Sequence, residues 1–532
     1  MTGQTPITLV DAEGGVAAAP EAMRHKRRSS FFDWPSILLL VALYGPFLLG
    51  PCLAFSQLTV GASLILSSAL LALAMGLHLG FSTLMIERVT RVKPLSIDSL
   101  PESTQQVLTS VCAKHGLPLP RLGLIEQDEP NAFTFGRSSR PCVAVTRGLL
   151  AFDPANLNAV LAHEIGHVYH RDFTLVTVAA FPAVLLLFIY SLVRRASGVA
   201  SSYKTMWQLL SESVRLVHVL AQLLFLALSR VREHRADAFA AQIPGTAQHL
   251  ADALQEIAAW RPTSEAERRT PAAVFASPPR QIAVVRMLGI AELQPAPVNV
   301  HVPSRGLPWQ LLNPWALIYE ARSTHPAISR RVAQLRRIAA AEEDPLSVSD
   351  AAVRWRYLAS DLPMWLLPAV AVALWTASTH DHLPLFWLGS ALAAMRICLS
   401  RRGRRCLRTL GDVLDDARPS PARAIAVSVE ATVSRVERQG FRRTLVLQDG
   451  ADTLPARISA LSPIVGHRSA TWLHRRIRVE GWVWRRPDVV LEPFRLIDVG
   501  TEQCLVSYSY SIKLLLIAWV TIGRSIIMLL TT

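Results

Sequence analysis

Hydrophobic residues gather in seven runs that alternate with more polar stretches of the chain. A helix needs about 20 residues to cross a bilayer, and most of these runs approach that length. The runs span residues 36–55, 61–81, 173–193, 206–228, 362–378, 383–399 and 508–530. This pattern predicts an α-helical membrane protein whose spans alternate with domains outside the bilayer.

Two of the runs contain charged residues and leave alternatives open. The run 206–228 carries Glu212 in its first half, so it is a span whose polar end is buried in protein or a helix in the interface. The run 508–530 contains Lys513 and Arg524. It is a span with a polar stripe or an amphipathic helix lying in the interface.

The stretches between the runs have the patterns of folded domains. Short apolar segments at 121–126 and 142–145 predict strands. Asp153 followed by Pro154 predicts the start of a helix. Short alternating segments between residues 420 and 500 predict five strands of a small β-barrel that resembles an OB-fold.

Composition and charge support a membrane protein. Of the 532 residues, 51% are hydrophobic and 18% are charged, against about 25% charged residues in soluble domains. A single soluble globule and a disordered scaffold are therefore excluded. Basic clusters at 24–28 and 401–405 border apolar runs and account for part of the net charge of +15. Such clusters indicate the cytoplasmic side of a membrane.

The predicted barrel carries the remaining candidate for a charged partner. Strand alternation places Arg478, Trp482 and Trp484 on one face. An exposed face of this kind can stack on single-stranded nucleic acid or rest on anionic lipid. Because the barrel lies between membrane segments, we expect contact with the bilayer and no nucleic-acid partner.

The strongest chemical signal is an HExxH motif formed by His163, Glu164 and His167. Two histidines four residues apart on a helix point the same way and can hold one zinc ion. Glu164 lies beside them, and its carboxylate is free to act as general base on a water that the metal activates.

Three further residues complete a predicted peptidase site. Glu233, which lies 66 residues after His167 on its own predicted helix, is the candidate for the third zinc ligand. Asp237 follows one helical turn later and can orient the N–H of a ligand imidazole. His325 is a candidate for the second group, besides zinc, that stabilises the oxyanion.

These motifs together resemble the HtpX family of membrane zinc metallopeptidases, which includes the type I CaaX prenyl endopeptidases. The resemblance covers about residues 36–340, with two apolar runs before the catalytic part and a hydrophobic hairpin within it. Four segments carry it in order: PNAFTFG at 130–136, VTRGLL at 145–150, LNAVLAHEIGHVYHRD at 157–172 and SRVREHRADAFA at 229–240.

The resemblance implies a zincin-type α+β metallopeptidase domain with zinc as cofactor. It implies zinc ligation by His163, His167 and Glu233 and a catalytic base at Glu164. It also implies a substrate-binding edge strand, which contains Asn131, Ala132 and Phe133. A His-Pro element with a later Arg matches His325 and Arg331, although the family's second Pro is Ala327 here.

The predicted organisation has eight parts. They are a disordered tail (1–30), two transmembrane helices (31–86), a first peptidase part (87–172), a hydrophobic hairpin (173–228), a second peptidase part (229–357), a transmembrane hairpin (358–400), an OB-like barrel (418–500) and a last helix (507–531). The parts after residue 357 depart from the family pattern, so we expect them to regulate the enzyme, recruit substrate or hold a partner.

The predicted function is that of a zinc metalloendopeptidase, a multi-pass hydrolase of the inner (plasma) membrane whose site faces the cytoplasm. Its expected substrates are proteins or peptides, above all membrane proteins in protein quality control. His167 and Glu233 lie about 9 Å and 8 Å along a helix from the nearest apolar run. We therefore expect zinc within about 10 Å of the membrane surface.

Two other functions account for part of this sequence. An intramembrane site-2-type protease would bury its HExxH motif in a span and use a distant Asp as a ligand. Here the polar residues Asp153, Asn156 and Asn158 precede His163, and Glu233 is available as a ligand. A non-catalytic membrane tether, whose basic barrel binds nucleic acid, lipid or protein, is the alternative from a different functional class.

Overall fold

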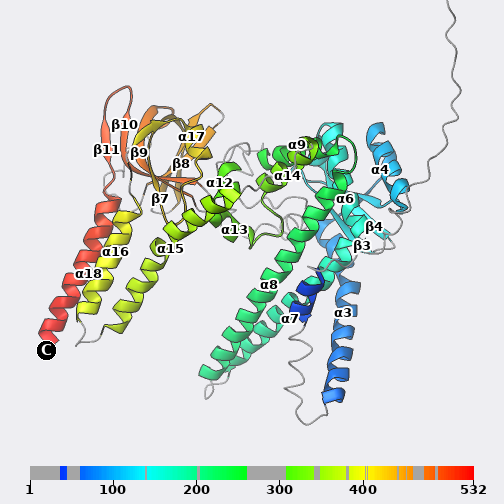
Figure 1. The fold of residues 1–532 in the computed structure, drawn as a ribbon, viewed down its shortest axis with the longest axis horizontal. Coiled ribbons are helices and arrows are strands. Elements are labelled where there is room, and N and C mark those ends of the chain that lie inside the picture. Colours follow the sequence, from blue (N-terminus) through cyan, green and yellow to red (C-terminus); the bar gives the residue numbers. More distant parts are fainter. Residues whose placement is uncertain are drawn as a thin grey trace, which may run out of the picture.

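The chain folds into two groups of long helices that extend in the same direction from two folded regions (Figure 1). The computed structural model describes residues 36–44, 60–137, 140–199, 204–260, 307–340, 348–378, 383–401, 403, 405–439, 442–450, 452–458, 472–485 and 489–531. The tail predicted at 1–30 lies outside these residues. Of the first apolar run, residues 36–44 are described, and they are helical.

Five of the described helices contain a stretch that is long and apolar enough to cross a membrane. These helices are α3 (Val60–Thr90), α7 (Asp172–Val199), α8 (Lys204–Ala240), α15 (Val348–Ala377) and α18 (Ser509–Thr531). The apolar helix α16 (Leu383–Leu399) is shorter. Large apolar side chains such as Leu77 and Leu220 are exposed along these helices, which is typical of surfaces that face lipid.

Helix α8 is continuous over 37 residues. The expectation that Glu233 lies on its own helix is therefore wrong, because the apolar run 206–228 and Glu233 belong to one element. The apolar part of α8 packs on α7, since Ala221 and Leu228 share a buried cluster with Leu175 of α7. Glu233 is thus joined to the apolar part of α8 by uninterrupted helix.

A four-stranded sheet in the order β1-β2-β4-β3 forms the base of the first folded region. Its strands are β1 (Lys93–Leu95), β2 (Arg121–Ile125), β3 (Ala132–Arg137) and β4 (Arg140–Thr146). The pair β2–β4 is parallel, and the other pairs are antiparallel. The strands predicted at 121–126 and 142–145 are confirmed, and β3 lies at the edge of the sheet.

Helices pack on this sheet around one apolar core. They are α4 (Glu102–His115), α6 (Pro154–His170), α9 (Thr246–Ala259) and α14 (Ile328–Ala340), with η2 (Ile97–Ser99) and α5 (Arg147–Leu150) as short connections. Leu161 of α6, Leu254 of α9 and Leu335 of α14 are fully buried in this core. Burial of these leucines fixes α6 against the helices that follow it in the chain.

Local sequence determines where α6 begins and ends. The side chain of Asp153 accepts a hydrogen bond from the backbone N–H of Ala155, and Pro154 occupies the first turn, as the sequence predicts. The helix ends at Arg171, which has a φ of 55° in the left-handed region. Because the chain turns at this residue, α7 starts at Asp172 in a new direction.

The second folded region is a closed five-stranded β-barrel. Its strands are β6 (Ile425–Gln439), β7 (Arg442–Asp449), β8 (Asp452–Ile458), β9 (Arg476–Arg485) and β10 (Val489–Asp498). They pair in the order β6-β7-β8-β10-β9 and close back on β6, with β8 and β10 parallel. The short elements β5 (Cys406–Arg408), α17 (Leu410–Asp415) and β11 (Cys504–Val506) flank the barrel.

The tryptophan face of the barrel is covered, which corrects the expectation of an exposed aromatic surface. Trp482 is only 7% exposed. Its ring contacts that of Tyr510 at the start of α18, and its indole N–H donates to the carbonyl of Arg401. The alternation along the strand is as predicted, but α18 and the segment after α16 cover this side of the strand.

The last helix packs beside the α15–α16 hairpin. The guanidinium of Arg524 donates to the carbonyl of Ser378, 3.0 Å away at the far end of α15. At the other end of α18, the ammonium of Lys513 lies 2.7 Å from the carboxylate of Glu492 in the barrel. The two cations therefore have separate partners at opposite ends of the helix, which favours a span over an interfacial helix.

Two short helices lie between the folded regions. They are α12 (Leu307–Leu312) and α13 (Pro314–Glu320). Asn313 caps α13, since its side-chain oxygen accepts from the backbone N–H of Trp315. The indole of Trp315 in turn donates to Asp361 of α15.

Candidate active site

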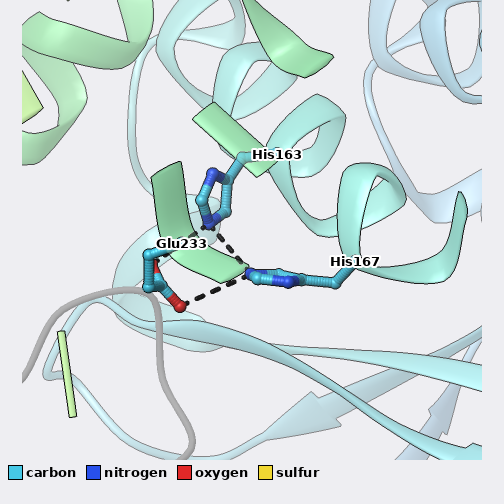
Figure 2. A group of neighbouring side chains, drawn as sticks. All are labelled: His163, His167 and Glu233. Atoms are coloured by element: carbon cyan, nitrogen blue, oxygen red, sulfur yellow. Dashed lines mark hydrogen bonds and ion pairs between the residues drawn. The ribbon is translucent and has the colours of Figure 1, made fainter. Parts of the chain in front are cut away.

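Two crossing helices bring the HExxH motif and the distant glutamate together. α6 supplies His163 and His167, and α8 supplies Glu233; Figure 2 shows the three side chains converging. The two histidine Nε2 atoms are 3.2 Å apart. The carboxylate oxygens of Glu233 lie 3.6 Å from Nε2 of His163 and 3.5 Å from Nε2 of His167.

A glycine allows this close crossing. A Cβ atom at Gly166 would lie 3.2 Å from both Cα and the carbonyl oxygen of Ala236. Because Gly166 has no side chain, the backbone of α6 approaches α8 closely enough for Glu233 to reach both histidines.

The other ring nitrogen of each histidine faces a carboxylate. Nδ1 of His163 lies 2.9 Å from Asp237, one turn beyond Glu233 on α8. Nδ1 of His167 lies 2.8 Å from Asp172 at the start of α7, and Asp172 also pairs with Arg232. Carboxylates at Nδ1 hold the proton there and leave Nε2 as the metal-binding atom.

The donor set fits a zinc ion. Two imidazole nitrogens and one carboxylate, all within 4.8 Å of one another, are a common protein ligand set of catalytic zinc sites and leave a position for water. The tautomer imposed by Asp237 and Asp172 agrees with this, since both Nε2 atoms are directed at Glu233. These three residues include no thiol or thioether, which are the ligands that favour softer metals.

Burial and neighbouring charges shift the pKa values of the two histidines in opposite directions. Burial lowers the pKa of His163, but contacts with Asp237 and Glu233 outweigh it and raise this pKa to about 9. Burial, together with the charge of His163, lowers the pKa of His167. A metal ion at the site would take the place of the proton on His163.

Arg331 of α14 lies beneath the cluster and is completely buried. Its Nε and one terminal nitrogen donate to Asp237 at 2.9 and 2.7 Å. The other terminal nitrogen lies 3.1 Å from Glu233. Arg331 is not among the described residues that line the adjacent cavity. Its position therefore fits orientation of the two carboxylates, and not contact with a substrate.

Glu164 and His325 face a cavity of about 100 Å³ beside the metal-binding cluster. The hydroxyl of Thr134 on β3 donates to the Glu164 carboxylate at 2.7 Å. Nδ1 of His325 lies 3.0 Å from Glu233. Nε2 of His325 is buried and has no hydrogen-bond partner in the described part of the chain.

The cavity extends from the cluster to the apolar helices. Residues of β3, α3 and α7 contribute to its wall, among them Gly136, Ile86 and Val176. The cavity is therefore continuous with the surface of helices that are long and apolar enough to cross a membrane.

The segment Asn131–Ala132–Phe133 enters the edge strand β3. The side chains of Ala132 and Phe133 are buried in the domain cores, and Asn131 donates its backbone N–H to the hydroxyl of Thr146. The next residues along β3, Thr134 to Gly136, line the cavity. Only the backbone edge of the predicted segment is thus placed to meet a peptide.

Sequence reasoning missed the parts played by Thr134 and Asp172. Thr134 lies inside the PNAFTFG segment, and its contact with Glu164 depends on the packing of β3 against α6. Asp172 follows His167 by five residues, a spacing that does not place it on the same face of a straight helix. It reaches Nδ1 because the chain turns at Arg171.

Comparison with known proteins identifies relatives of this region. Peptidase family M48 matches residues 99–339. The chain is 30% identical to the protease HtpX homolog of Methanopyrus kandleri over 268 residues, which are 49% of this chain and 73% of the relative. It is 39% identical to that of Acidiphilium cryptum over 33% of this chain and 63% of the relative. It is 35% identical to the protease HtpX homolog 2 of Methanosarcina mazei over 37% of this chain and 68% of the relative. The family match ends before α15 and the barrel.

Proposed function

Because the chain belongs to peptidase family M48, as an HtpX-like membrane metallopeptidase, we propose that it is a zinc-dependent endopeptidase that cleaves membrane proteins at the cytoplasmic surface. The observation that carries this proposal is the cluster of His163, His167 and Glu233 beside Glu164. A protease of this family acts on proteins or peptides. The metal, the substrate class and the orientation are the parts that we add.

We assign zinc to His163, His167 and Glu233. Bound zinc would supply a Lewis acid that polarises the scissile carbonyl and activates a water. Asp237 and Asp172 hold the proton of each imidazole at Nδ1, and Arg331 keeps Asp237 and Glu233 ionised through direct ion pairs. These neighbours prepare the ligands in the protonation state that metal binding requires.

Glu164 is the proposed catalytic base. Its carboxylate lines the cavity next to the ligands, and the hydroxyl of Thr134 fixes one of its oxygens. From this position the carboxylate can accept a proton from the attacking water and later deliver it to the leaving amine.

His325 is the proposed donor to the oxyanion. Two observations support this role: its Nε2 has no hydrogen-bond partner among the described residues, and its side chain lines the cavity. The outer backbone edge of β3, which pairs with no further strand among the described residues, is the proposed site at which the substrate adds a strand.

Two observations support membrane-protein substrates and a cytoplasmic site. The cavity wall includes residues of α3 and α7, so a peptide leaving the bilayer would meet the site at once. The last turn of α3 carries Arg88 and is followed by Arg91, and the barrel end of α16 is followed by Arg401. Positive residues at these ends are typical of the cytoplasmic side.

We also propose the domain division given by the sequence. In that division a zincin-type peptidase domain in two parts, 87–172 and 229–357, is interrupted by the α7–α8 hairpin. The barrel is proposed to be OB-like, which its strand order and its parallel β8–β10 pair support.

The alternative of a non-catalytic tether has less support. The aromatic residues that would bind nucleic acid pack on the adjacent helices, as Trp482 does on Tyr510. A lipid or protein partner of the barrel would not conflict with peptidase activity.

The deciding test compares wild type with Glu164→Gln in the full chain in detergent or nanodiscs. We expect one bound zinc in both proteins, cleavage of a membrane-protein reporter by wild type only, and loss of that cleavage on chelation and its return with zinc. Gln248→Glu, an amide-to-acid change on the exposed face of α9, serves as the control. Proteolysis retained by Glu164→Gln would refute the proposal.

A further inference from the structure

The barrel makes a closely packed junction with α12 and α13. The indole N–H of Trp309 donates to the carbonyl of Pro419 at 2.7 Å, and Nδ2 of Asn313 donates to the carbonyl of Ala417 at 2.9 Å. The guanidinium of Arg485 in β9 stacks 4.9 Å from the centre of the Trp309 ring. Trp309, Asn313 and Arg485 are each at most 4% exposed, so the contact is buried on both sides.

The opposite end of α13 is held by a residue of the ligand helix. One terminal nitrogen of Arg230 in α8 lies 3.0, 3.1 and 2.9 Å from the carbonyls of Glu320, Ala321 and Ser323. These are carbonyls at the end of α13 and just after it, which have no partner within the helix. Arg230 lies three residues before Glu233 on the same helix, so the clamp and the ligand move together.

His325 follows directly after this clamp. The hydroxyl of Ser323 donates to the carbonyl of His325 at 2.8 Å, and its oxygen accepts from the backbone N–H of His325 at 3.2 Å. The position of the His325 imidazole next to Glu233 therefore depends on where α13 ends. A second link runs through Arg330 of α14, which pairs with Glu320 at 3.0 Å.

We propose that the barrel positions His325 through α12 and α13, with Arg230 as the positioning residue at the catalytic end. This inference rests on the proposed function, because it concerns the part of His325 in peptide hydrolysis. A displacement of about 1 Å at a reacting group can lower a rate about a hundredfold. The barrel, although outside the family match, thus belongs to the architecture of the active site.

Asn313 allows the link to be cut selectively. Its Oδ1 caps α13, while its Nδ2 donates to the carbonyl of Ala417 in the segment that leads from α17 into the barrel strand β6. Asn313→Asp keeps a good capping oxygen but replaces the donor to Ala417 by an acceptor that faces a carbonyl. In the full chain we expect kcat to fall about tenfold, which corresponds to the loss of one hydrogen bond. KM and bound zinc should stay unchanged, and amide hydrogen exchange should rise in residues 321–327. Gln248→Glu on α9 is the matched control.

Arg230 provides a second, independent variant. Lysine can reach one of the three carbonyls but not all of them, so kcat should decrease in the order wild type, Arg230→Lys, Arg230→Gln. Arg336→Gln, which removes an exposed guanidinium on α14, should behave as wild type. Rescue by lysine distinguishes positioning of the loop from a general loss of folding.

Two results would overturn the inference. One is wild-type kcat and wild-type exchange at 321–327 in Asn313→Asp. The other is a loss of zinc parallel to the loss of kcat in both variants, which would place the effect on the ligands. The exchange measurement requires no activity. If wild type cleaves nothing, the proposed function fails, while exchange at 321–327 still decides whether the barrel holds this loop.

Discussion

Asp172 lies 2.8 Å from Nδ1 of His167 although the two residues belong to different helices. The left-handed turn at Arg171 brings them together. We predict that Asp172→Asn lowers zinc affinity about 10- to 100-fold, as the loss of a carboxylate behind a ligand histidine commonly does. Competition titration with a chromogenic chelator at constant pH measures this. Asp98→Asn, on the exposed helix η2, should bind zinc as wild type does, and equal affinity of both variants would contradict the prediction.

Removal of Arg331 should destabilise the peptidase domain strongly. The guanidinium is fully buried between Asp237 and Glu233, and its loss leaves buried carboxylates without compensation. Arg331→Met is expected to lose about 3–5 kcal/mol of unfolding free energy, measured by denaturation of the apoprotein in detergent. The double variant Arg331→Met with Asp237→Leu should recover part of this loss. A single variant as stable as wild type would argue against the ion pairs.

The crossing of α6 and α8 should not tolerate a side chain at Gly166. A Cβ there meets the backbone of Ala236 at 3.2 Å, so Gly166→Val forces the helices apart. We expect a loss of about 1–3 kcal/mol of stability from overpacking and weaker zinc binding, because Glu233 moves away from the histidines. Gly80→Val is the matched control, since a Cβ at Gly80 meets no atom within 4 Å. Equal effects of both variants would show that the crossing is not responsible.

The contact between the barrel and α18 should depend on pH. Burial raises the pKa of Glu492, but Arg401 and Lys513 outweigh it and lower this pKa below its ordinary value. A carboxylate with a lowered folded-state pKa stabilises the protein above its unfolded-state pKa of about 4.3 and loses this contribution as the pH falls towards the folded-state value.

Melting curves in detergent between pH 7 and pH 3.5 test this dependence. Wild type should lose more of its melting temperature below about pH 4.3 than Glu492→Gln, which should start lower and decline less. Parallel pH profiles of the two proteins would exclude a role for this carboxylate.

Much of the local structure could be predicted from the sequence. The spans, the start of α6 at Asp153, the strands β2 and β4 and the five barrel strands follow from the spacing of apolar residues and from capping residues. The spacing of His163 and His167 is likewise a local matter, since four residues make about one helical turn. A span needs one apolar run of about 20 residues, a helix repeats about every 3.6 residues and a strand repeats about every two. Each of these patterns can be recognised without knowing what the element contacts.

The sequence by itself determined the membrane class of the protein, the barrel and the HExxH helix. Only the tertiary structure decided that α8 is one helix, that Asp172 reaches His167, that Arg331 pairs with Glu233 and that Trp482 is covered by Tyr510. The physical reason is range. Periodicity shows which face of an element is apolar or polar, but the partner of that face is set by the packing of segments that are distant in the chain.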